Sequence, residues 1–207
     1  MDMSSPYAVV LSPAEGPILA VLAGTTKALS GREVARLSGV SVNGAWKALH
    51  RLAEHGLVLE EPAGGNTTLY ALNRDHIAHE AVATLTRLRS ILVDRIREKV
   101  ASWEIPPPHA SLFGSTARGD GDTRSDVDLF FVRPTGVGEE DVRWRSQLDE
   151  LAEVIWSWTG NRASVAEMPE DELASLRRDR PPIVEEVMRD GITLAGEPAS
   201  SVLGRLR

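Results

Sequence analysis

The pattern of apolar and polar residues over positions 12–56 predicts three short helices. Each helix begins at a capping residue, Ser12, Ser30 or Ser41, and each start is followed by apolar residues at spacings of three and four. The second start, Ser30-Gly31-Arg32-Glu33, has the serine and the glutamate of a capping box. The second and third helices are joined by a tight turn, because Gly39 ends one and Ser41 opens the next.

Two runs of strand-forming residues, 57–60 and 67–72, flank Gly64-Gly65-Asn66 and predict a β-hairpin. Three helices followed by a hairpin resemble a winged helix-turn-helix domain over residues 6–73. The resemblance implies that the third helix reads the major groove of double-stranded DNA. Its outward residues, whose polar and cationic groups suit base edges and phosphates, are Asn43, Trp46, Lys47, His50 and Arg51. The alternative is an ordinary solvated helix in a domain that mediates protein contacts.

Apolar residues at helical spacing predict an uninterrupted helix over residues 75–102. The stripe is either the seam of a homodimer or a surface on which two domains dock, and a long helix after a winged helix favours the dimer. The stripe consists of Ile77, Ala81, Leu85, Leu88, Leu92 and Ile96. Pro106-Pro107-Pro108 cannot continue a helix. We therefore expect a DNA-binding domain at 1–75, a linker and dimerisation helix at 76–105, and a second domain at 106–207.

Residues 112–132 read as a strand, a glycine turn, a helix start and a second strand. Side chains alternate between the faces of a strand, so Asp126 and Asp128 point to one side while the residues between and after them point into a core. Two adjacent carboxylates repel each other unless a proton or a cation intervenes, and Mg²⁺ suits such oxygens. The turn at Gly114 and Ser115 offers backbone donors to a phosphate.

These residues resemble the signature of the DNA polymerase β-like nucleotidyltransferase superfamily, in particular its minimal nucleotidyltransferases. The matching stretches are Gly114-Ser115, Ala117-Arg118-Gly119 and Ser125-Asp126-Val127-Asp128-Leu129, and the resemblance covers residues 108–196. It implies that Asp126 and Asp128 are catalytic and hold Mg²⁺. It also implies that Gly114, Ser115 and Arg118 bind a nucleoside triphosphate, taken to be ATP. The alternative for Arg118 is a surface pairing with Asp120 or Asp122.

A third carboxylate is normally supplied by a later strand in this superfamily, and residues 163–168 are the corresponding strand here. The position that best fits the pattern holds Ser164, which cannot replace a carboxylate. Glu167 is the only acid in the strand and is therefore the remaining catalytic candidate. Alternation places it on the face opposite Ser164 unless a bulge or a register shift turns it inward. The expected triad is incomplete or rearranged.

Taken together, the expected fold class is α+β. It comprises the N-terminal winged helix-turn-helix, the long linker helix and a C-terminal polymerase β-like nucleotidyltransferase domain with a mixed sheet and flanking helices. The second domain should also contain helices over 139–158, 169–178 and 182–189, and a closing turn and strand over 190–196.

The composition of the chain excludes several kinds of site and makes several classes of protein less consistent with the sequence. The 207 residues include no cysteine, which excludes disulfides and thiolate metal sites, and the formal net charge of −7 argues against non-specific coating of nucleic acid. No apolar run is long enough to span a bilayer, and no secretory signal opens the chain. We expect a cytoplasmic protein with no membrane partner.

Three functions fit these features. The first is an enzyme that transfers a nucleoside monophosphate, AMP from ATP, to a protein, RNA or small-molecule acceptor, in the setting of a toxin-antitoxin system. The second is a winged-helix transcriptional regulator whose nucleotidyltransferase domain binds nucleotide and Mg²⁺ with weak or no turnover. The third is a purely structural domain, for which an adjacent acid pair has little physical purpose. The acceptor, the nucleotide base, the DNA operator and any protein partner stay open.

Overall fold

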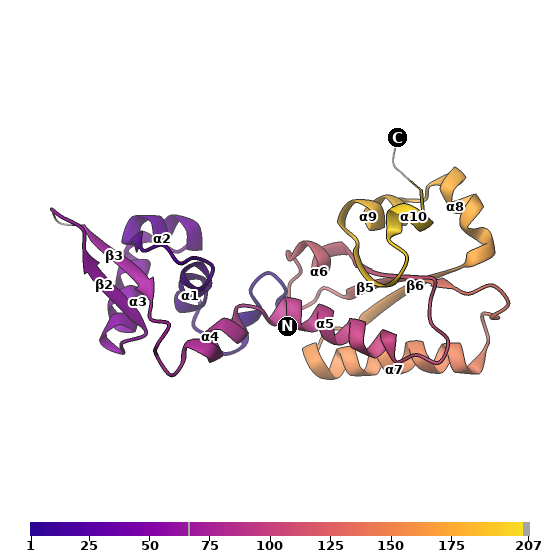
Figure 1. Cartoon of the computed structure of the whole chain (residues 1–207), viewed down its shortest axis with the longest axis horizontal. Coiled ribbons are helices and arrows are strands. Elements are labelled where there is room, and N and C mark those ends of the chain that lie inside the picture. The colour runs from indigo at the N-terminus through magenta and orange to yellow at the C-terminus, as the bar shows by residue number, and fades with distance from the viewer. Residues whose placement is uncertain (66, 205–207) are drawn as a thin grey trace. The chain divides into compact units, whose positions relative to one another are not determined.

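The computed structural model describes residues 1–65 and 67–204, so Asn66 of the expected hairpin turn lies outside the described residues. The chain divides into two compact units. One is Ser5–Leu88, and the other combines Met1–Ser4 with the chain from Arg89 onward (Figure 1). The boundary therefore falls between Leu88 and Arg89, whereas the sequence placed it at the three prolines 106–108.

The N-terminal unit packs helices against a small antiparallel sheet in the order β1-β3-β2. Ser30 caps α2 in a full capping box with Glu33, and Ser41 Oγ accepts from the backbone N–H of Gly44 at the start of α3. Ile18 of α1 and Leu49 of α3 are completely buried in this unit's core. The elements are the short 3₁₀ helix Pro6–Val9, α1 (Glu15–Ala23), β1 (Leu29–Ser30), α2 (Gly31–Ser38), α3 (Val42–Glu54), β2 (Val58–Pro62), β3 (Thr68–Leu72) and α4 (His79–Leu85).

The second unit is built around a four-stranded sheet in the order β6-β5-β4-β7. Strand β5 pairs parallel with β6 and antiparallel with β4, and β4 pairs antiparallel with β7. The elements are α5 (Leu88–Ala101), β4 (His109–Phe113), α6 (Gly114–Arg118), β5 (Val127–Arg133), α7 (Val142–Thr159), β6 (Ala163–Pro169), the 3₁₀ turn Glu170–Glu172, α8 (Leu173–Asp179), α9 (Pro182–Asp190), β7 (Ile192–Gly196) and α10 (Ala199–Val202).

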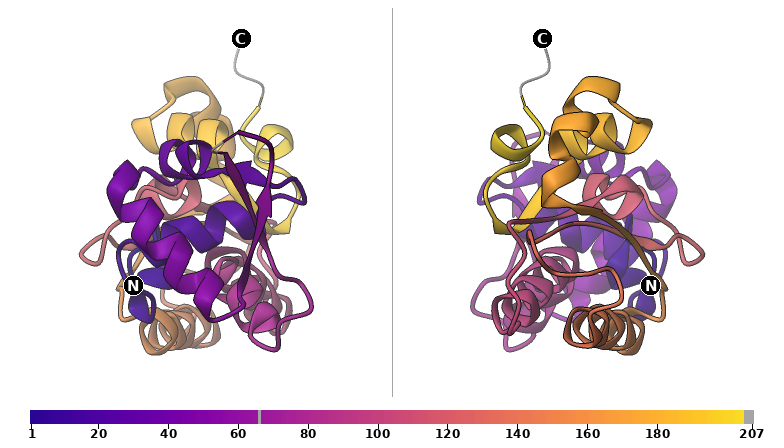
Figure 2. Two further views of the ribbon diagram at one scale, coloured as in Figure 1. Left: turned by 90° about the vertical axis from the view of Figure 1, so that its left-hand side faces the viewer. Right: turned by 90° about the vertical axis from the view of Figure 1, so that its right-hand side faces the viewer.

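Helices cover both faces of this sheet, with α5 and α7 on one side and α9 and α10 on the other (Figures 1 and 2). The alternation along β5 explains the two layers. Leu129 and Phe131 share a core cluster with Trp144 of α7, whereas Phe130 packs with Val187 of α9. The expected mixed sheet with flanking helices is confirmed, and the β5 face that carries Asp128 is the one covered by α9.

The uninterrupted helix expected over residues 75–102 is wrong. Two helices, α4 and α5, occupy this stretch, and the first ends where Thr84 and Thr86 donate their hydroxyls to the carbonyls of Glu80 (2.9 Å) and Ala83 (3.0 Å). Such side-chain bonds compete with the helical pattern.

The α5 part of the apolar stripe is not a free dimer seam. Leu92 and Ile96 are 3% and 0% exposed, because they pack into the core of their own unit. Ile77, by contrast, is 97% exposed. Over the described residues, no helix combines the length and the apolar character needed to cross a membrane.

Candidate active site

The turn between β4 and α6 brings the backbone directly against an acid of β5. Gly114 has φ of 68°, in the left-handed region that favours glycine, and a Cβ built on it would overlap the carboxylate of Asp128. The register explains the approach, because Phe113 is the partner of Asp128 across the two antiparallel strands. The glycine is therefore required twice, once by its backbone angle and once by the space that Asp128 occupies.

The acid pair lies at the start of β5, as the sequence indicated. Asp126 is exposed in the loop before the strand, and Asp128 is half-buried within it. Burial raises the pKa of the Asp128 carboxyl above its ordinary value, and the nearby charges of Asp126 and Glu186 raise it further, while Arg118 lowers it. The raised pKa of Asp128 therefore reflects burial first and the neighbouring carboxylates second.

Ser115 is the second residue of α6 and its carbonyl holds the start of the next loop. The backbone N–H groups of Gly119 and Asp120 donate to Ser115 O at 2.9 and 3.0 Å. The hydroxyl of Thr116 donates to the carbonyl of Asp126 at 3.3 Å. These contacts tie the glycine-serine turn to the loop that carries the first aspartate.

Arg118, at the end of α6, is held by two carboxylates. Its Nε is 3.1 Å from Asp120 Oδ2 and its Nη1 is 3.2 Å from Asp190 Oδ2 of α9. These two hydrogen bonds raise the pKa of the guanidinium, that to Asp120 most strongly. The pairing with Asp120 was the alternative considered from the sequence, and the partner in α9, 72 residues away, was not expected.

The strand β6 does not bring its acid to the pair. Ser164 is the partner of Asp128 in the parallel register, and Glu167 is the partner of Phe131, on the other face. There Glu167 accepts from Trp144 Nε1 at 2.7 Å and pairs with Arg145 at 3.2 Å. No bulge turns Glu167 inward, so the structure separates it from Asp126 and Asp128.

Glu186 of α9 is a carboxylate that sequence reasoning missed. It is half-buried and its charge acts on Asp128. The available signal was its position four residues before Asp190, which places both acids on one face of the helix. Even so, among residues 1–65 and 67–204 no group of three or more His, Asp or Glu side chains could hold a metal ion.

The donor set fits a hard ion that retains other ligands. Mg²⁺ is usually bound through one or two carboxylates, and waters and substrate phosphates complete its octahedron. The residues that could provide those carboxylates here are Asp126 and Asp128.

In the N-terminal unit, the predicted outward side of α3 is exposed at Asn43, Trp46, Lys47 and Arg51, and His50 is half-buried. Two of these residues are already paired within the unit. Arg51 forms a salt bridge with Glu15, and His50 Nδ1 lies 3.1 Å from Glu60.

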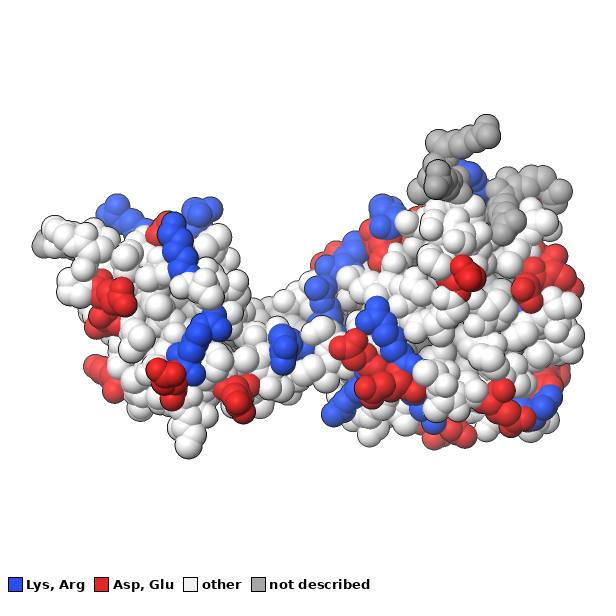
Figure 3. All heavy atoms as spheres, in the orientation of Figure 1, with Lys and Arg blue, Asp and Glu red and all other residues white. Residues whose placement is uncertain are grey.

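The ring of Trp46 packs edge-on against that of His50, with 4.4 Å between the centroids. Both residues line a groove of about 630 Å³, together with Arg32 and Tyr70. The unit has equal numbers of basic and acidic residues, and Figure 3 shows both signs on the face in view. The N-terminal unit as a whole therefore has no excess of Lys and Arg over Asp and Glu.

Residues 93–178 match the model of the nucleotidyltransferase domain family. One similar solved structure is a mutant of the toxin-antitoxin MntA-HpeT, at 17% identity and a TM-score of 0.36, covering 51% of this chain and 73% of that one. Another is a toxin-antitoxin with AMP-PNP, at 18% identity and a TM-score of 0.37, covering 54% of this chain and 80% of that one. No curated protein matched the chain. The family match over residues 93–178 agrees with the nucleotidyltransferase domain expected from the sequence.

Proposed function

We propose that this chain, whose residues 93–178 match the nucleotidyltransferase domain family, transfers a nucleoside monophosphate from a nucleoside triphosphate to an acceptor hydroxyl. ATP is the proposed donor, and the acceptor is a protein, an RNA or a small molecule. The single observation that carries the proposal is the close approach of the Gly114 turn to Asp128, because backbone N–H groups at this turn would then face a phosphate held beside the carboxylate pair. A structural domain has no need of both features at one point.

In the proposed reaction, the acceptor oxygen attacks the α-phosphorus in line with the departing pyrophosphate. Asp126 and Asp128 would hold Mg²⁺, which neutralises charge on the phosphate oxygens when bound. Gly114 and Ser115 would contact the β- and γ-phosphates. Arg118 would exchange one of its carboxylate partners for the developing charge of the leaving group, since its guanidinium already lies close enough to lower the pKa of Asp128.

A second candidate function is nucleotide binding with weak or no turnover. It is favoured by Ser164, which lies beside Asp128 where a third carboxylate would stand, and by the engagement of Glu167 with Trp144 on the far face. The acceptor hydroxyl would then have no strand-borne base to take its proton. Such a domain would still bind metal and nucleotide.

The N-terminal unit we propose to be a winged helix-turn-helix that binds double-stranded DNA. Support comes from the order of α1, α2, α3 and the β2–β3 hairpin, and from the exposed side chains of α3. Because Arg51 and His50 are paired with acids, Lys47 and Asn43 would make the main contacts with phosphates and bases. The setting we propose, on the motif resemblance, is a toxin-antitoxin operon.

The decisive experiment incubates the purified chain with ATP labelled at the α-phosphorus and Mg²⁺, alone and with cell extract. Label transferred to an acceptor supports the enzyme, and calorimetric binding of Mg·ATP without label transfer supports the second candidate. Replacing Asp126 and Asp128 by asparagine should abolish metal-dependent binding in either case. A control with the same change in charge replaces the exposed Asp171 and Glu172 by their amides. Binding that survives in the Asp126 and Asp128 variant would refute the site.

A further inference from the structure

A buried asparagine lies at the turn between α7 and β6, close to the loop that leads to the acid pair. Asn161 is 3% exposed and follows Gly160, whose φ of 72° ends the helix. Its Nδ2 donates to the carbonyls of Ser125 (2.8 Å) and Asp122 (3.4 Å), and its own N–H donates to Thr159 Oγ1 (3.0 Å). A buried amide side chain that donates to two backbone carbonyls has a structural role inside the fold.

The segment Met1–Ser4 holds the same loop at a neighbouring carbonyl. The backbone N–H groups of Met3 and Ser4 donate to Gly121 O at 2.8 and 3.0 Å. The side chain of Met3 is 2% exposed and belongs to the main core of the second unit. The amino group of Met1 donates to Thr159 O at 2.6 Å and also to Asn161 Oδ1. Asn161 and the segment Met1–Ser4 therefore belong to one connected network of hydrogen bonds.

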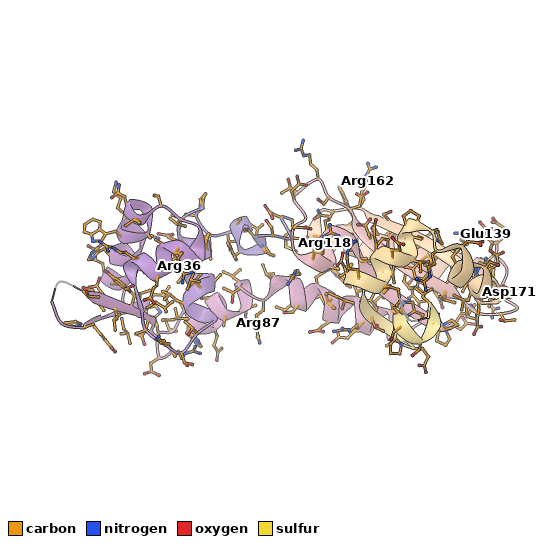
Figure 4. The ribbon with its side chains drawn as sticks, turned by 90° about the horizontal axis from the view of Figure 1, so that it is seen from above. Arg36, Arg87, Arg118, Glu139, Arg162 and Asp171 are labelled. Carbon is orange, nitrogen blue, oxygen red and sulfur yellow. The ribbon has the colours of Figure 1, made fainter. Side chains whose placement is uncertain are left out.

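The loop held in this way is residues 119–126, and it ends on the first aspartate. Its start is fixed by the bond from Asp120 N to Ser115 O (3.0 Å), and its exit by the bond from Val127 N to Arg162 O (2.8 Å). Arg162 is the next residue after Asn161, and its own side chain points out to solvent (Figure 4). Between these ends, Met1–Ser4 donates to the carbonyl of Gly121, and Asn161 donates to the carbonyls of Asp122 and Ser125.

We propose that Asn161, braced by Met1–Ser4, is a positioning residue for the carboxylate of Asp126. The carboxylate itself is exposed, so its place is set by the backbone of the loop rather than by packing of its side chain. Metal sites lose affinity when a ligand is displaced by a fraction of an ångström, and the groups that hold the ligand therefore tune the site. The expected effect of Asn161 on nucleotide binding rests on the proposed function, whereas its hold on the loop does not.

The experiment compares the full-length parent with Asn161→Ala and Asn161→Asp. The aspartate keeps the shape of the side chain but cannot donate to the carbonyls of Asp122 and Ser125. Asn73→Ala is the matched control, because Asn73 also donates through Nδ2 to a backbone carbonyl, that of Gly56 at 2.8 Å, within the N-terminal unit. Each protein is measured by hydrogen exchange over residues 119–127 and by calorimetric titration with ATP in the presence and absence of Mg²⁺.

Both Asn161 variants should exchange the loop amides about fivefold faster, as expected for the loss of one net hydrogen bond. Their Kd for Mg·ATP should rise by about fivefold to tenfold, while metal-free binding of ATP changes less than twofold. Asn73→Ala should leave both measurements at the parental values. The metal dependence is the signature of a displaced ligand, because a general loss of stability would weaken binding with and without Mg²⁺.

Unchanged exchange over residues 119–127 in both Asn161 variants would overturn the proposal. So would faster exchange with a parental Kd for Mg·ATP, or an equal effect of Asn73→Ala. If the parent itself binds no nucleotide, the proposed function fails, and the exchange data alone still decide whether Asn161 holds the loop. The two failures are therefore distinguishable.

Discussion

Replacing Gly114 by alanine should lower the stability of the second unit and also weaken the site. At φ of 68° a residue with a Cβ costs about 1–2 kcal/mol. The new methyl group would also overlap the Asp128 carboxylate, and relieving such an overlap costs typically about 1–3 kcal/mol. We expect the free energy of unfolding to fall by about 2–5 kcal/mol in total. Asp128 must also move, so Mg·ATP should bind at least about tenfold more weakly, which corresponds to about 1.4 kcal/mol.

A matched control separates the two contributions. Gly136 has φ of 84° in the same unit, and a Cβ there would meet nothing within 4 Å. Gly136→Ala should therefore lose only the backbone contribution of about 1–2 kcal/mol, with parental nucleotide binding. Thermal unfolding resolves the difference, because 1 kcal/mol moves the Tm by about 2–8 °C in domains of this size range. Equal changes in Tm and in Kd for the two variants would refute the reasoning.

The remaining predictions concern pH, the third carboxylate and DNA. Because the folded-state pKa of Asp128 is raised, protons should compete with Mg²⁺ and weaken Mg·ATP binding as the pH falls through that pKa. Glu186→Gln removes a neighbouring charge that raises this pKa, so it should shift the loss to lower pH, and an unshifted titration would contradict the assignment. Ser164→Asp should place a third carboxylate beside Asp128 and increase label transfer, whereas Glu167→Gln should leave transfer unchanged in the same assay. Lys47→Ala should weaken binding to a DNA selected from a random pool and reduce the salt slope by about one, and an equal effect of Lys27→Ala would argue against α3 as the reading helix.

Local signals in the sequence were enough for most of the elements, but not for the break between α4 and α5. The capping box of Ser30 and Glu33 and the cap at Ser41 depend on residues three positions apart, so they do not require contacts with distant parts of the chain. The face on which Asp128 lies follows from strand alternation, and Gly114 comes directly after β4. These are properties of neighbouring residues, which the printed order of the chain contains.

Tertiary structure alone decided which groups meet across long separations. From the sequence, the apolar stripe of residues 75–102 could be a dimer seam or a surface on which two domains dock. In the structure, Leu92 and Ile96 of α5 pack instead in the core with residues of β4 and β5, because the sheet needs a cover on that face. Arg118 pairs with Asp190, 72 residues further along the chain. Asn161 donates to Ser125, in the loop before Asp126 and 36 residues earlier in the chain. Spacing in the sequence carries no information on such pairs, since they are fixed only when the helices dock on the sheet.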